Sequence, residues 1–148
     1  MDLIDILNYL LPEGMDGGIS TSPLSYKLWF ENSQETHDAK IKSTNSLMKV
    51  VARLVEIKKS EGKSIHIDLE PEPDGILENT QEVIDFYREY LFALGKKQLQ
   101  TKLNCSPEEA KSHILEHLQL CYDVCHFALA YEQPREVVEL LQKEGIKI

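Results

Sequence analysis

The segment IHIDLEPEPDGILENT, residues 65–80, changes character halfway along its length. From Ile65 onward, apolar and polar residues alternate with the period of a half-buried strand. Acidic residues then alternate with Pro71 and Pro73, whose rings fix the backbone angle φ and remove hydrogen-bond donors. The pattern predicts a strand over residues 64–70, a stiff loop rich in carboxylates, and a helix that follows the loop.

The rest of the chain alternates helical patterns with short apolar strands. Helices are predicted over residues 2–11, 34–60, 80–94, 106–117 and 134–144, and strands over residues 17–22, 64–70, 118–124 and 146–148. Gly62 and Gly95 are predicted to end the helices that precede them. Strands separated by helices pair in parallel, so the sequence predicts an α/β fold of parallel (β/α) units in a single domain over residues 1–148. A small doubly wound sheet and a portion of a (β/α) barrel both satisfy this order.

Charge and composition narrow the classes of partner. With 25 acidic against 16 basic residues the net charge is −9, which argues against binding to nucleic acid. The acidic balance is compatible with a cytosolic enzyme or with a site that attracts cations. No run approaches the roughly 20 apolar residues of a membrane helix, and the first residues lack the basic region of a secretory signal. Cys105, Cys121 and Cys125 are predicted to be free, buried thiols, so a cytoplasmic location is expected.

Three groups of polar residues follow strand ends, where parallel α/β folds bind their ligands. One group runs from Ser20 to Ser22 and continues to Tyr26 and Lys27. The second group follows the strand that ends at Glu70 and also contains Glu72 and Asp74. The third group follows the next strand and contains Asp123, Cys125 and His126. Two close carboxylates repel unless a proton or cation lies between them.

The set Glu70, Asp123 and His126 therefore predicts a site for Mn²⁺, Mg²⁺, Co²⁺ or Zn²⁺. Glu72, Tyr26 and Lys27 are candidates to bind the substrate, although ordinary solvated loop residues are an equally simple interpretation of them. The remaining histidines fall within a strand or helices and are expected to be structural or surface residues: His37, His66, His113 and His117.

Three segments resemble the xylose isomerase-like (AP endonuclease 2-like) TIM barrels, and among them the metabolite traffic protein EboE family. They are GGISTSPLSYKLWF (residues 17–30), IHIDLEPEPDGILENTQEVIDFYREYL (residues 65–91) and LQLCYDVCHFALAYEQPREVVELLQKEGIKI (residues 118–148). The resemblance implies a metal-dependent isomerase or epimerase of sugars or sugar phosphates. It makes Glu70 both a metal ligand and the catalytic base, Asp123 a metal ligand, and His126 a ligand of the metal or the substrate.

The resemblance also implies that the chain is a partial TIM barrel. Such barrels have eight strands in about 250 residues, whereas this chain of 148 residues supplies material for about strands four to seven. The family's remaining ligands, a histidine and a glutamate, would lie beyond Ile148, and it stays open whether the partial chain holds the metal. Three alternatives remain: assembly of a homo-oligomer through exposed sheet edges, a non-catalytic metabolite-binding subunit of a transport system, and a free-standing small α/β domain without a metal site.

Overall fold

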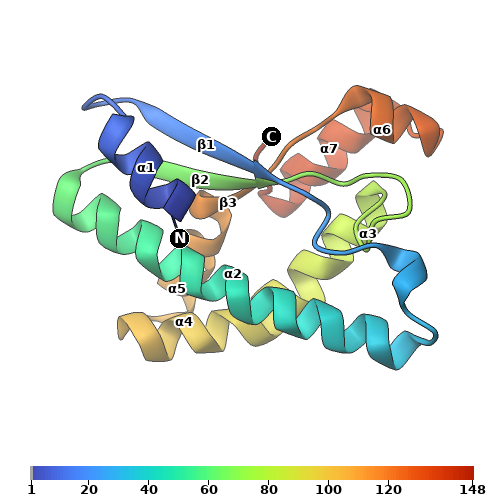
Figure 1. Ribbon diagram of the computed structural model, residues 1–148, viewed down its shortest axis with the longest axis horizontal. Coiled ribbons are helices and arrows are strands. Elements are labelled where there is room, and N and C mark those ends of the chain that lie inside the picture. Colours follow the sequence, from blue (N-terminus) through green and yellow to red (C-terminus); the bar gives the residue numbers. More distant parts are fainter. Residues whose placement is uncertain (1) are drawn as a thin grey trace.

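Three parallel strands form the centre of the computed structural model, which describes residues 2–148 (Figure 1). They are β1 (Asp16–Thr21), β2 (Ser64–Leu69) and β3 (Leu118–Leu120), in the spatial order β1-β2-β3. Helices separate each strand from the next, so the predicted α/β order with parallel pairing is confirmed. The sheet is open, and the described residues form no closed barrel.

The helices begin and end largely where the sequence places caps. They are α1 (Asp2–Leu10), the 3₁₀ turn η1 (Lys27–Trp29), α2 (Ser33–Glu61), α3 (Thr80–Asp85), the π-helical η2 (Phe86–Gly95), α4 (Lys96–Leu103), α5 (Pro107–His117), α6 (Val124–Leu129) and α7 (Pro134–Glu144). Ser106 and Glu109 form a reciprocal capping box at the start of α5. Gly62 ends α2 in the left-handed conformation. Across residues 2–148, no helix has the length and apolarity that crossing a bilayer demands.

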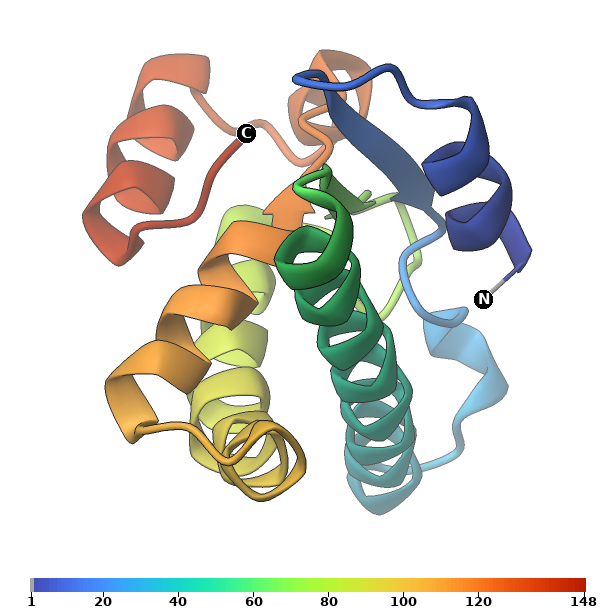
Figure 2. The same cartoon turned by 90° about the vertical axis from the view of Figure 1, so that its left-hand side faces the viewer.

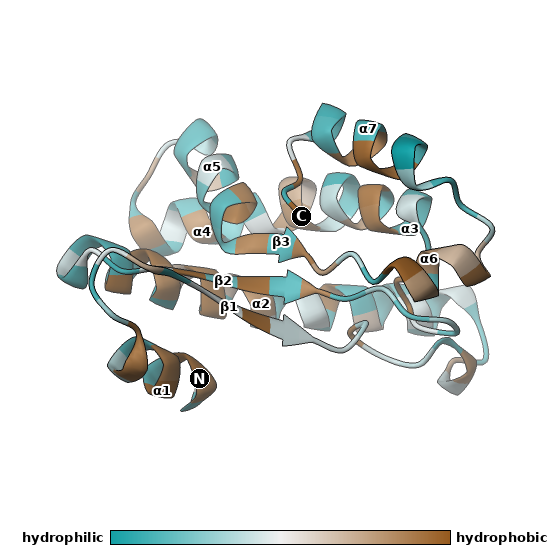
Figure 3. Ribbon diagram, turned by 90° about the horizontal axis from the view of Figure 1, so that it is seen from above, coloured by the Kyte–Doolittle hydropathy of each residue, from teal (hydrophilic) through white to brown (hydrophobic). Residues whose placement is uncertain are grey.

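The core lies between one face of the sheet and the long helices. The residues of β2 alternate between buried and half-buried, and Ile65, Ile67 and Leu69 are the buried ones. Helices α2 and α5 pack against β2 on that side, below the sheet in Figure 2. In Figure 3 the strands lie in front of α2 and α4, and no helix covers the near face of the sheet. That face carries the half-buried residues His66 and Asp68, and Nδ1 of His66 lies 2.7 Å from Oδ1 of Asp68.

The prediction that Gly95 ends a helix is wrong. Its φ and ψ of −61° and −41° are helical, and the helix continues through α4 to Asn104, which takes the left-handed conformation. A Cβ atom on Gly95 would lie 2.8 Å from the sulfur of Met48 in α2. The glycine is therefore required for close packing of η2 on α2, not for a turn.

Two predictions near the carboxyl end of the chain also need correction. The strand predicted over residues 118–124 is only three residues long, because the chain turns at Asp123 into α6. Residues 146–148 form no strand, although the Leu120 amide donates a hydrogen bond of 2.9 Å to the Lys147 carbonyl beside β3. The three cysteines are free as predicted, but they are not buried: Cys125 is exposed and the other two are half-buried.

Candidate metal centre

Glu70, Asp123 and His126 come together at the carboxyl edge of the sheet. Glu70 directly follows β2, while Asp123 and His126 follow β3, and these two strands are parallel neighbours. One ligand atom from each side chain lies within 4.8 Å of the others. Nε2 of His126 is 3.6 Å from Oδ2 of Asp123, and its Nδ1 is 3.9 Å from Oε1 of Glu70. The predicted convergence of the three side chains is therefore present.

The imidazole of His126 is oriented by the proline-rich loop after β2. Nδ1 lies 3.1 Å from the carbonyl oxygen of Pro71. A carbonyl can only accept a hydrogen bond, so Nδ1 carries a proton, and in the neutral ring Nε2 presents a lone pair. Histidines that bind metals usually donate their second N–H to a carbonyl or carboxylate in this way. The Pro71 carbonyl thus selects the tautomer that a metal ligand needs.

Each carboxylate has one oxygen bonded to the protein and one directed at His126. The Ser20 hydroxyl donates to Oε2 of Glu70 at 2.7 Å. Oδ1 of Asp123 accepts a bond of 2.7 Å from the Cys125 amide, as the N-cap of α6. That backbone bond, with the nearby His126, holds the pKa of Asp123 below its usual value. Oε1 of Glu70 and Oδ2 of Asp123 remain available for a cation.

The thiol of Cys121 lies beside this centre. Burial raises its pKa, and the neighbouring charge of Glu70 acts in the same direction, so the group is a neutral thiol at pH 7. The possible ligands that the structure brings together here are two carboxylate oxygens and one imidazole nitrogen, a set that suits Mn²⁺, Mg²⁺, Co²⁺ or Zn²⁺. All three of these side chains are half-buried, which leaves room for water or a ligand.

Lys27 is held by acidic residues of the next loop and helix. Its ammonium nitrogen lies 2.6 Å from Glu78 and 2.9 Å from Glu82. Burial lowers the pKa of Lys27, but the two carboxylates outweigh burial and raise it overall. The lysine thus ties the loop after β1 to the start of α3, and its contact with an anionic substrate stays a prediction.

Tyr26 and Glu72 line a pocket of about 340 Å³ formed by the loops after β1 and β2. Its other lining residues are Ser22, Pro23, Leu24, Ser25, Trp29, Pro73 and Gly75. The rings of Tyr26 and Trp29 meet edge to face, with centroids 5.9 Å apart. Because these loops leave the carboxyl ends of the strands, the pocket opens at the same edge of the sheet as the three candidate ligands.

Sequence reasoning missed some of the residues that build the site. It named Ser20 as part of a polar group but not as the partner of Glu70, and nothing in the sequence marks the Pro71 carbonyl as the partner of His126. It also treated His113 and His117 as structural, although they form a second group of possible ligands with Glu116 in α5. The spacing of two histidines four residues apart on a helix is the feature that indicates this group.

Comparison with known proteins does not assign the chain to a family. No protein-family model, no curated protein and no solved structure matches it. The resemblance to the EboE family therefore stays a prediction, and the fold and site rest on the strand order and the geometry described above.

Proposed function

We propose that Glu70, Asp123 and His126 bind a divalent cation, and that the site acts on a small polar metabolite such as a sugar or sugar phosphate. The observation that carries the proposal is the convergence of three free ligand atoms, from the loops after two neighbouring strands, at the carboxyl edge of a parallel sheet. Two carboxylates that close are stable together only when a cation or a proton offsets their repulsion.

The donor set suits isomerase or epimerase chemistry. A bound divalent cation supplies Lewis-acid polarisation of substrate oxygens. Glu70 is held by the Ser20 hydroxyl at one oxygen, which leaves the other directed into the site. That oxygen is suited to take a proton from one substrate carbon and return it to the next whenever it is not bound to the cation. His126 would orient the substrate or complete the cation site.

The open three-stranded sheet supports the proposal that the chain is part of a TIM barrel of the xylose isomerase-like, EboE type. Its three strands would correspond to about strands four to six, and residues 146–148 to the beginning of strand seven. The long helices cover one face of the sheet, as the outer helices of a barrel do, and the other face carries polar side chains. The remaining strands would come from a longer chain or from a second copy that pairs with an open sheet edge. Light scattering after size exclusion tests the second-copy version, since a stable monomer contradicts it.

A non-catalytic metabolite-binding subunit is the second candidate. The observation that favours it is the pocket beside the centre, where Trp29 keeps 74% of its surface exposed and stands next to Tyr26. Exposed aromatic rings of this kind can bind sugar rings by stacking, which requires no catalytic group. Binding of sugars that is not accompanied by isomerase or epimerase turnover would favour this candidate.

Calorimetric titration with Mn²⁺ tests the cation site. We expect binding by the native chain and a loss of affinity in Glu70→Gln and in Asp123→Asn. Glu13→Gln is the matched control, because it removes the same charge from an exposed residue far along the sequence from the site. Absence of Mn²⁺ binding, or equal binding by all four proteins, would contradict the proposal and favour a small α/β domain without a metal site.

A further inference from the structure

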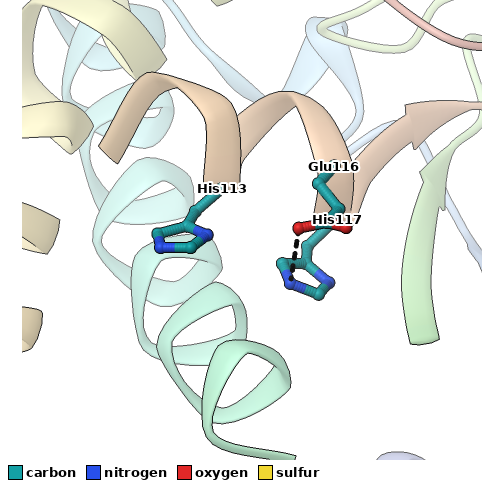
Figure 4. A group of neighbouring side chains, drawn as sticks. All are labelled: His113, Glu116 and His117. Atoms are coloured by element: carbon teal, nitrogen blue, oxygen red, sulfur yellow. Dashed lines mark ion pairs between the residues drawn. The ribbon is translucent and has the colours of Figure 1, made fainter. Parts of the chain in front are cut away.

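A second group of ligand-type side chains lies on α5: His113, Glu116 and His117 (Figure 4). One ligand atom of each lies within 4.8 Å of the others. His117 is adjacent to Ile65, near the start of β2, whereas Glu70 follows the end of that strand. Five residues of extended chain separate these ends by roughly 16 Å, so the group is distinct from the centre described above.

His117 presents an unsatisfied nitrogen inside the protein. The side chain is fully buried, with 0% of its surface exposed. Its Nδ1 lies 2.7 Å from the Ile65 carbonyl, so Nδ1 carries the proton and Nε2 is an acceptor. Within residues 2–148, Nε2 has no hydrogen-bond partner and lies 3.7 Å from Oε2 of Glu116. The buried Nε2 thus faces the half-buried carboxylate of Glu116 without a hydrogen bond of its own, which is costly unless a positively charged group lies between the two atoms.

His113 supplies a further possible ligand atom on the same side of the helix. Its Nδ1 is also buried without a partner among the described residues. The centroids of the His113 and His117 rings are 6.5 Å apart, as expected for residues one helical turn from each other. Burial lowers the pKa of both histidines, which favours the neutral form of each ring.

The surroundings of this group contain both favourable and opposing charges. A pocket of about 370 Å³ lies over it and is also lined by Val55, Lys58 and Lys59 of α2. Lys58 is bonded to Oε1 of Glu116, which leaves Oε2 directed at His117. The two lysines oppose a further cation, whereas the carboxyl end of α5, where His117 is the last residue, attracts one through the helix dipole.

We propose that His113, Glu116 and His117 form a transition-metal site that takes Zn²⁺ or Co²⁺. Two imidazole nitrogens and one carboxylate oxygen are ligands that Zn²⁺ prefers, while Mn²⁺ and Mg²⁺ prefer sites richer in oxygen. The Ile65 carbonyl fixes the ring of His117 as metal sites require. Bonds to Zn²⁺ of about 2.0–2.2 Å require the three atoms, now within 4.8 Å of one another, to move closer together when the metal binds.

The first test is a Zn²⁺ titration by calorimetry in a chain that carries Glu70→Gln and Asp123→Asn, so that the centre at the other end of the sheet is disabled. We expect one Zn²⁺ per chain, and a loss of affinity of roughly 10-fold or more when His113→Gln is added. His113→Gln is well suited to this purpose, because Nδ1 of His113 has no hydrogen bond in residues 2–148 to lose. No Zn²⁺ binding by the disabled chain, or binding that His113→Gln leaves unchanged, would overturn the proposal.

A second pair of variants separates metal binding from a structural role. His117→Asn keeps an amide donor near the position of Nδ1, for the Ile65 carbonyl, and removes Nε2; it should abolish Zn²⁺ binding. Lys58→Gln removes the cation that competes for Glu116 and should increase Zn²⁺ affinity, a gain that a purely structural cluster would not show. Mn²⁺ titration of His113→Gln in the otherwise native chain reports only on the centre formed by Glu70, Asp123 and His126. Failure of the proposed function can therefore be told apart from failure of the proposed Zn²⁺ site.

Discussion

Nε2 of His126 faces Oδ2 of Asp123 at 3.6 Å, and neither atom donates a hydrogen bond when Nδ1 carries the proton. The Pro71 carbonyl enforces that tautomer at 3.1 Å. The same arrangement recurs at the other end of the sheet, where the Ile65 carbonyl holds His117 against Glu116. In both places a backbone carbonyl from β2 or its loop directs the second imidazole nitrogen toward a carboxylate, a geometry in which a proton or a metal cation can lie between the two atoms.

Asp123→Asn should weaken Mn²⁺ binding by roughly 10-fold or more while leaving the fold intact. Asparagine is an N-cap as effective as aspartate, so the bond from the Cys125 amide and the start of α6 are preserved. Asp123→Ala removes both functions, and we expect it to lower the thermal midpoint as well as the affinity. Calorimetry with Mn²⁺ and circular dichroism measure the two effects. Equal loss of stability in both variants would show that the carboxylate itself, not the cap, maintains the fold.

Ser20→Ala tests whether the hydroxyl on β1 positions Glu70. The bond of 2.7 Å from Ser20 to Oε2 leaves Oε1 directed at His126. Its removal should reduce Mn²⁺ affinity by about 10-fold, the usual effect of losing a group that orients a ligand. Ser22→Ala is the control, because Ser22 lies in the same segment and lines the neighbouring pocket. Unchanged affinity in Ser20→Ala would show that Glu70 keeps its position without help from β1.

The strand pattern and the convergence of the site were predictable for the same reason. Alternation from Ile65 onward identifies β2, and helices between the strands impose parallel pairing. Parallel strands end at one edge of the sheet, so Glu70 after β2 and the segment of Asp123 and His126 after β3 were expected near each other, while their exact positions depend on the turn into α6. These predictions depend only on local periodicity and on the direction of the chain.

Other features depend on contacts between distant segments and could not be predicted. A glycine within a helical pattern is compatible with a helix end or with close packing, and only the position of Met48 in α2 decides the outcome for Gly95. Lys27 appears free in the sequence because Glu78 and Glu82 follow it by more than 50 residues. The observed strand β3 is shorter than the predicted one because the Asp123 side chain caps α6, a helix that the periodicity of the sequence did not indicate.

Lys27→Met should lower the free energy of unfolding near neutral pH and make it less dependent on pH in the acidic range. The Lys27 bond holds the pKa of Glu78 below the value of 4.5 that it has in an unfolded chain. The unfolded state therefore binds more protons in this range, so the pair stabilises the native protein above pH 4.5 and the contribution is lost as the pH falls through the native pKa. Because the pair is partly exposed, we expect the free energy of unfolding at pH 7 to be about 0.5 kcal/mol lower in Lys27→Met than in the native chain. Urea unfolding of both proteins at pH 7 and pH 3.5 measures this difference in free energy. A difference of the same size at both pH values would contradict the linkage to Glu78.

Gly75→Ala should destabilise the loops that enclose the pocket. A Cβ atom on Gly75 would lie 2.6 Å from Cβ and Cγ of Pro23, and a proline ring cannot swing aside as a flexible chain can. Overpacking of this kind costs about 1–3 kcal/mol. Trp29 is the one tryptophan of the sequence and lines the same pocket, so its fluorescence reports on the displacement.

Gly14→Ala is the control for this prediction. Gly14 has a φ of +78° but open space around its Cβ position, so alanine there introduces backbone strain without contact with the pocket. We therefore expect Gly14→Ala to lower the free energy of unfolding while the emission of Trp29 in the native state stays unchanged. Gly75→Ala should alter both quantities. Native Trp29 emission in Gly75→Ala identical to that of the unmodified chain would show that the Pro23 loop accommodates the methyl group without moving the pocket.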